Sequence, residues 1–270
     1  MNIDLNADVG EGCDDESLLP FLTSVNVACG MHAGSPGLMD RTVSMALGRG
    51  VRIGAHPGYD DRANFGRKEI DLPNDEVENL VLYQIAALDG FVRSHGGRLA
   101  HVKAHGALYN RAAREMELAR AIARAVRRYR EDLVLVGLAG SKLLTAAEES
   151  GVPGAGEAFA DRRYLANGAL MPRSQTGSVL TDPADAAEQA VRIASMAWSS
   201  LPTGRACPSP PVRCACTAIH LAHHGLRKRF ANGSSARGSA SHRSPEISAP
   251  RDECDAPVRP TRPVRTPRSP

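Results

Sequence analysis

The residues best suited to chemistry in this 270-residue chain stand in two segments, IDLNADVGEG at 3–12 and HVKAHGALYN at 101–110. In each, a short strand-like run ends in carboxylates, imidazoles, an amine or a phenol, with glycine beside them. Enzymes built from β/α units display their catalytic groups in this way, at the carboxyl ends of their strands. VNVACGMHAG at 25–34 and IGAHPGY at 53–59 repeat the pattern. Four such strand ends predict an enzyme.

Acidic and amide side chains alternate along the first segment. Asp4, Asn6 and Asp8 are two residues apart, so their side chains share one face of an extended strand. Inside a barrel this face is the lumen, where a carboxylate is costly unless it binds a cation or forms an ion pair. Glu11 extends the cluster. We interpret these residues as functional; the alternative is a solvated strand end with helix-capping carboxylates.

Basic side chains alternate in the same way along the second segment. His101, Lys103 and His105 share one face, and Tyr109 follows them. A lysine and two histidines share a buried face only when something anionic or metallic lies opposite, and the carboxylates of the first segment are candidates. Imidazoles supply acid–base chemistry near neutral pH, and together with carboxylates they also bind divalent metals. The spacing leaves both roles open.

Three more residues are candidates because of their position. His56 directly follows an expected strand, where a ligand in the lumen would lie, and His32 follows another. Taken alone, a residue such as His32 is more often an ordinary loop histidine. Arg173 could bind a carboxylate or phosphate with two parallel hydrogen bonds, although a surface salt bridge explains it as well.

Strands and helices alternate along the first 195 residues. We expect strands at 3–6, 24–29, 51–55, 99–104, 133–137 and 156–160, and helices at 14–22, 36–47, 74–94, 114–129, 142–150 and 184–194. Repeated β/α units joined by short loops predict a mainly parallel sheet, open or closed.

The composition divides the chain in two. Residues 1–195 hold 21 Lys and Arg against 26 Asp and Glu, whereas residues 196–270 hold 12 against 4 and 11 of the 18 prolines. We predict a β/α domain over 1–195 and a disordered Arg/Pro/Ser-rich tail over 196–270, with a basic helix at 218–230 as its one ordered element. The sequence shows neither a signal peptide nor an apolar stretch of about 20 residues, so we expect a cytoplasmic protein without membrane contact.

Several motifs in the first 195 residues resemble, in order, those of the LamB/YcsF family, the A subunits of 5-oxoprolinase. They are IDLNADVGEG, TSVNVACGMHAG, GAHPGYDD, HVKAHGALYN, FADRRY and MPRSQTGSVL. The resemblance implies a TIM-like (β/α) barrel of the sugar deacetylase type. It also implies ATP-dependent opening of 5-oxo-L-proline to L-glutamate, shared with subunits PxpB and PxpC, with ATP and Mg²⁺ as co-substrate and a divalent metal in the barrel as an option.

The resemblance and the chemistry of the side chains together give a set of site residues. We predict Asp8, His56, Lys103, His105 and Tyr109 as catalytic, Asn6, Glu11 and Arg173 as substrate-binding, and Asp4, His32 and His56 as metal ligands. In this scheme a histidine is the base, an aspartate orients it, and Lys103 or Arg173 binds the substrate carboxylate or phosphate.

The carboxyl end departs from the family pattern. The resemblance implies a further strand with a His-Gly-Asp motif, which this chain lacks, and a frameshift would produce the abrupt change near residue 196. We therefore expect a barrel without its last strand, with an exposed sheet edge. Three alternatives follow: a stand-alone metal-dependent amidohydrolase or deacetylase, an inactive truncated subunit, and a nucleic-acid-binding tail. The scarcity of aromatic residues between the arginines disfavours the last.

Overall fold

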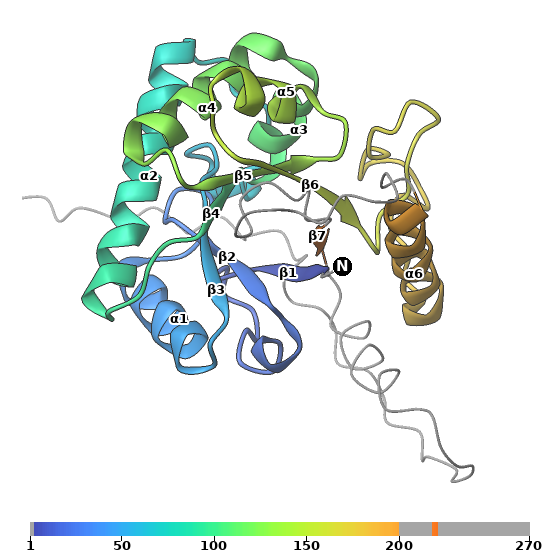
Figure 1. Ribbon diagram of the computed structural model, residues 1–270, viewed down its shortest axis with the longest axis horizontal. Helices are drawn as coiled ribbons and strands as arrows, with labels where there is room; N and C mark the ends of the chain where they lie inside the picture. The colour runs from blue at the N-terminus through green and yellow to red at the C-terminus, as the bar shows by residue number, and fades with distance from the viewer. Residues whose placement is uncertain (1–2, 200–217, 221–270) are drawn as a thin grey trace, which may run out of the picture.

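The computed structural model describes residues 3–199 and 218–220, and its centre is a parallel sheet (Figure 1). Within the described residues the strands are β1 Asp4–Val9, β2 Ser24–Ala28, β3 Arg52–His56, β4 His101–Lys103, β5 Val134–Leu138, β6 Gly154–Phe159 and β7 Ala218–His220. Each strand pairs in parallel with the next, and β7 pairs with β1, so the sheet closes into a barrel. The predicted TIM-like β/α architecture is confirmed.

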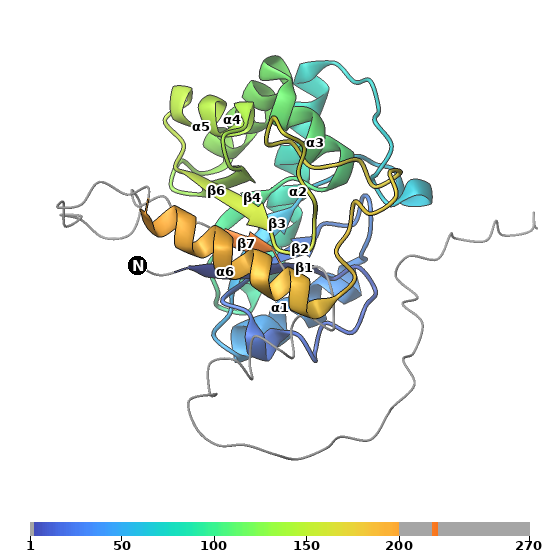
Figure 2. The same ribbon diagram turned by 90° about the vertical axis from the view of Figure 1, so that its right-hand side faces the viewer.

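The helices lie outside this sheet, as Figure 1 shows. They are α1 Pro36–Gly48, α2 Asn74–Ser94, α3 Gly106–Arg114, α4 Met116–Tyr129, α5 Lys142–Glu149 and α6 Pro183–Ser199, with 3-10 turns η1 Leu19–Phe21 and η2 Arg62–Asn64. In Figure 2, α6 crosses in front of β7 and β1. Gln189 of α6 donates to the backbone carbonyls of Phe159 and Ala160, which ties this helix to the end of β6. None of the described helices is both long and apolar enough to cross a membrane.

Local chemistry explains two differences from the predicted helices. The helix expected over 14–22 is a series of turns that contains only η1, because the Asp15 carboxylate accepts from Gly10 N at 2.7 Å and holds the chain back toward β1. The helix expected over 114–129 is present as α4, whereas α3, separated from it by a short break, was not predicted. The break is at Glu115, whose backbone is extended (φ −114°, ψ 111°) while its carboxylate binds Arg111.

The open sheet edge expected between the first and sixth strands is occupied by β7. Ala218 pairs with Asp4 of β1 on one side and with Glu157 of β6 on the other. The helix predicted over 218–230 is therefore wrong at 218–220, which form a strand. The other predictions for the tail, disorder and a frameshift among them, lie outside the described residues.

A glycine in β3 gives space to a buried histidine of β4. Gly54 pairs with His101 across the sheet, and His101 Nε2 lies 2.7 Å from Asn26 Oδ1. A Cβ on Gly54 would lie 2.1 Å from His101 Nε2, well inside van der Waals contact. The lumen at this level accepts the imidazole only because β3 has no side chain there.

We expect Gly54→Ala to lower the free energy of unfolding by about 1–3 kcal/mol, because the added methyl group forces His101 off its position. Gly90→Ala is the matched control: Gly90 lies in α2 with nothing within 4 Å of its Cβ position, and alanine there stabilises a helix by about 0.5–1 kcal/mol. Urea unfolding of the three proteins measures both effects, and equal stabilities would contradict the steric argument.

Candidate active site and metal centre

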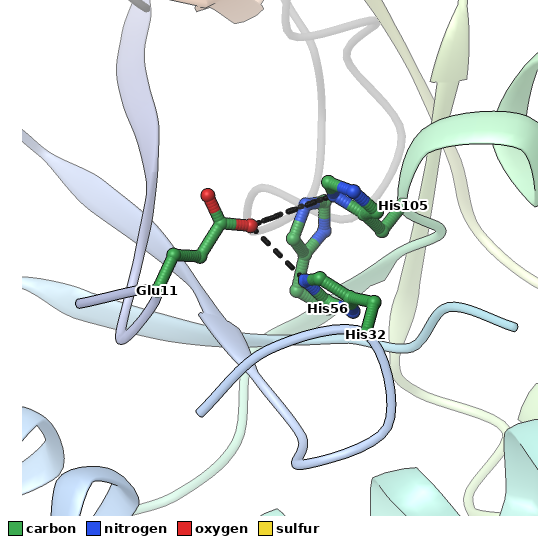
Figure 3. A group of neighbouring side chains, drawn as sticks. All are labelled: Glu11, His32, His56 and His105. Atoms are coloured by element: carbon green, nitrogen blue, oxygen red, sulfur yellow. Dashed lines mark hydrogen bonds and ion pairs between the residues drawn. The ribbon is translucent and has the colours of Figure 1, made fainter. Parts of the chain in front are cut away.

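Four side chains gather at the carboxyl ends of the first four strands (Figure 3). Glu11 follows β1, His32 follows β2, His56 ends β3, and His105 precedes α3 directly after β4. One potential ligand atom from each lies within 4.8 Å of the others. Three imidazoles and one carboxylate form a donor set that suits Zn²⁺ and related divalent metals. The predicted convergence of polar groups at strand ends is thus present.

Backbone carbonyls fix the tautomers of two of these histidines. His56 Nδ1 lies 2.7 Å from Lys103 O, and His105 Nε2 lies 2.9 Å from Phe65 O. A carbonyl oxygen only accepts, so both of these ring nitrogens carry hydrogen. The other nitrogens, His56 Nε2 and His105 Nδ1, face each other at 3.0 Å. In neutral rings both are acceptors, so a proton or a metal ion has to lie between them.

The surroundings of the three imidazoles separate their pKa values. His32 stacks on His105 with ring centroids 3.8 Å apart, and its Nε2 lies 3.0 Å from Glu11 Oε1. Burial lowers the pKa of His32 and of His105 to about 3, so both are neutral at pH 7. For His56, burial opposes charge, but Asp8 at 3.3 Å and Glu11 more than offset this and raise its pKa. The proton of the cluster therefore resides on His56. Burial raises the pKa of Glu11.

The loop after β3 holds the cluster in place. Phe65, whose carbonyl orients His105, has a left-handed backbone (φ 56°), which is rare for a residue with a side chain. A Cβ on Gly106 would lie 2.5 Å from Gly66 O, so these two loops approach as closely as glycine allows. Arg62 also binds Gly34 O at 2.8 Å, which joins this loop to the one that carries His32. The strain at Phe65 is consistent with a functional requirement on its carbonyl.

A second group of charges lies beside the histidines, around a buried lysine. Lys103 Nζ is 3.0 Å from Glu157 Oε2, 3.3 Å from Asp8 Oδ1 and 3.4 Å from Asn6 Oδ1. Burial alone would lower the pKa of Lys103, but Asp8 and Glu157 more than offset it and raise the pKa. Lys103 is therefore a fixed positive charge in the lumen. The predicted opposition of lysine and carboxylates is present.

Two polar residues of this group were not predicted. Glu157 is fully buried in β6, and Asn26 donates from one amide to Asn6 at 2.8 Å and to Asp8 at 2.9 Å. A glutamate within the small, apolar strand sequence GAGEAF was the available signal for Glu157. The signal for Asn26 was its position as the polar residue at the centre of the buried strand sequence SVNVA. Tyr109 is buried nearby, and burial together with the charge of Glu157 raises its pKa well above the usual value.

The structure does not bring two predicted residues into this site. Asp4 was predicted as a metal ligand, but it lies at the amino end of β1, where its carboxylate binds Thr23 (2.7 Å), Ser24 (2.6 Å) and Arg52 (2.7 Å). Glu11 and His105 complete the metal-ligating group in its place. Arg173 is exposed on the loop after β6, where its backbone carbonyl accepts from Ser178.

Comparisons with known proteins agree with the fold. The profile of the LamB/YcsF family matches residues 3–216. A protein of Limosilactobacillus fermentum, named as the A subunit of 5-oxoprolinase, is 49% identical over 212 residues, 76% of this chain and 84% of that protein. One of Methylococcus capsulatus with the same name is 49% identical over 214 residues, 77% of this chain and 82% of that protein. The crystal structure of a lactam utilization protein from Thermus thermophilus is similar, with a TM-score of 0.73 and 39% identity, covering 87% of this chain and 98% of the other.

Removing Lys103 should destabilise the fold, because the carboxylates buried beside it then lack a cation. We expect Lys103→Met to lower the free energy of unfolding by about 3–5 kcal/mol at neutral pH, because Glu157 stays buried without its cation. The deficit should shrink between about pH 7 and pH 5. The pKa of Glu157 is raised in the folded state, so protonation as the pH falls favours that state. Lys142→Met, at an exposed position, should change stability by less than about 0.5 kcal/mol.

Metal binding should depend on pH through His56. A divalent ion that binds His56 Nε2 has to displace the proton there, so Zn²⁺ affinity should rise with pH, by up to about tenfold per unit below the raised pKa. Glu11→Gln and His32→Asn should each weaken binding by at least about tenfold, whereas His95→Asn, an exposed histidine bound to Asp40, should not. Calorimetric titration in two buffers counts the released proton. An affinity independent of pH would contradict the assignment.

Proposed function

We propose that this chain, which belongs to the LamB/YcsF family, is the A subunit of a 5-oxoprolinase that opens 5-oxo-L-proline to L-glutamate with hydrolysis of ATP. The observation that supports this most is 49% identity, over about three quarters of the chain, to two proteins named as the A subunit of 5-oxoprolinase. Such a subunit works within a complex, and we propose PxpB and PxpC as partners and ATP with Mg²⁺ as co-substrate, in the cytoplasm.

The reaction makes clear chemical demands on the site. The substrate is a cyclic amide, so attack by water needs a base, and the developing oxyanion needs positive charge or hydrogen-bond donors. We assign Asp8 as the acceptor of the proton of the water; its carboxylate lies 3.3 Å from His56 Nε2 and 3.3 Å from Lys103 Nζ. Lys103 supplies fixed positive charge for the oxyanion or for a phosphate. Tyr109 keeps its proton because of its raised pKa and can serve as a donor.

The histidine cluster fits a divalent metal. Glu11, His32, His56 and His105 would hold it, and the carbonyls of Lys103 and Phe65 already orient two of the imidazoles, as is usual around bound metals. Such a metal would supply a Lewis acid and a water of lowered pKa. Without it, His56 and His105 share a proton, and Asp8 lies 3.3 Å from His56. Asn6 and Glu11 line the same lumen. We propose them, together with Arg173 of the loop after β6, as the residues that bind the substrate.

The same cluster favours a second candidate function, a metal-dependent amidohydrolase that acts alone. Three histidines and a carboxylate beside an aspartate are sufficient for hydrolysis of an amide without ATP. This candidate predicts turnover of lactams or acetylated amines by the isolated, metal-loaded chain. The 5-oxoprolinase proposal predicts none without ATP and the partner subunits.

The assay that tests the proposal is glutamate formation from 5-oxoproline and ATP by the purified chain mixed with PxpB and PxpC of a relative. We expect turnover only when all three proteins and ATP are present. Lys103→Ala and His105→Ala should each lower it by about 100-fold or more, while His95→Gln leaves it unchanged. Full activity of both alanine variants would refute the assigned roles. A folded chain without activity in any mixture would identify an inactive subunit.

A further inference from the structure

Arg162 is a buried arginine that has no ionic partner among the described residues. Its side chain is only 7% exposed, and one terminal nitrogen donates to Met171 O at 2.6 Å. Its Nε is buried and has no hydrogen-bond partner within the described part of the chain, and no carboxylate there lies within ion-pair distance. An unpaired buried charge is unfavourable, so proteins rarely keep one unless a ligand completes it.

The position of Arg162 connects it to the site. It follows β6 directly, on the same face of the barrel as Glu11 and the three histidines. The backbone here is fixed on two sides: Arg162 pairs with Val179 across the loop, and its carbonyl accepts from Gln189 of α6 at 2.8 Å. The backbone of Arg162 is therefore held rigidly at the mouth of the barrel.

Two further arginines lie close enough to influence it. Burial, and then the charges of Arg173 and Arg67, lower the pKa of Arg162 to about 10, while Asp161 opposes this in part. Arg67, on the loop after β3, packs over the Phe65 ring at 5.0 Å and also acts on the pKa values of Glu11 and His32. The charge of Arg67, on the loop that orients His105, thus acts on both Arg162 and the histidine cluster. An anion bound at Arg162 would offset the repulsion that Arg173 and Arg67 exert on it.

We propose that Arg162 is the centre of an oxyanion-binding site that holds the substrate at the mouth of the barrel, and that Arg67 and Arg173 contribute positive charge to it from the neighbouring loops. The ligand is a carboxylate or a phosphoryl group, because both present the paired oxygens that guanidinium groups bind. This inference rests on the proposed function for the identity of the substrate. The binding site itself can be tested without turnover.

The test is calorimetric titration of the purified chain with inorganic phosphate and with 5-oxoproline at constant ionic strength. Arg162→Gln should weaken binding by at least about tenfold, since a charged hydrogen-bonding partner is lost. Arg163→Gln is the matched control: it is exposed, adjacent on the same loop, and removes the same charge. Equal affinities of these two variants would overturn the proposal, as would failure of the wild type to bind either ligand.

Two comparisons keep the result decisive. If Arg162→Gln does not fold, a double variant, Arg67→Gln with Arg173→Gln, takes its place, because both residues are exposed. An unchanged affinity of this double variant for phosphate and 5-oxoproline would overturn the proposed site. 2-Pyrrolidone, the lactam without the carboxylate, distinguishes the ligands: loss of binding relative to 5-oxoproline identifies the carboxylate, and competition by phosphate supports a shared oxyanion site. Arg162-dependent binding without 5-oxoprolinase turnover would support the site while refuting the proposed function.

Discussion

The structure of this site depends on two ring nitrogens that cannot hydrogen-bond each other when both imidazoles are neutral. His56 Nε2 and His105 Nδ1 face each other at 3.0 Å, and each is made an acceptor by a backbone carbonyl on the opposite side of its ring. A cation between them is required. Much of the local structure maintains this arrangement, from the left-handed backbone of Phe65 to the close approach of Gly106 to Gly66. These loops therefore hold the two ring nitrogens in a geometry that requires a positive charge between them.

Lys103 joins this arrangement to the carboxylates. Its carbonyl orients His56, while its ammonium contacts Asp8 and Glu157. Asp8 in turn lies 3.3 Å from His56, so a proton or metal on the imidazoles and the charge of the lysine act on the same carboxylate. Removing positive charge from the cluster removes one of the two cations that face Asp8. The environment of Asp8 and the occupancy of the cluster are therefore linked.

Alternation in the sequence correctly predicted which side chains face the lumen, but not how far along the barrel each of them lies. Alternation by two places Asp4 and Asp8 on one face, yet four residues of strand separate them by about 13 Å, so Asp4 lies at the opposite end of the barrel. The carbonyl of Phe65 could not be predicted, because a backbone acceptor has no side-chain signature. Glu157 was missed for a related reason: its pairing with Lys103 joins residues that are far apart in sequence. The strand ends, by contrast, follow local rules, and these were predicted within a few residues.

The closing strand shows why a change in composition need not mark a structural boundary. β7 lies within the segment that composition assigns to the tail, yet it pairs with Asp4–Asn6 of β1 and with Glu157–Phe159 of β6. Strand pairing is made by backbone groups, so a segment of unusual composition can supply it. These two strands carry Asp8 and Glu157, the carboxylates on either side of Lys103. Three residues of β7 therefore hold the two walls of the charged lumen together, and the separation of those walls determines whether one lysine contacts both carboxylates.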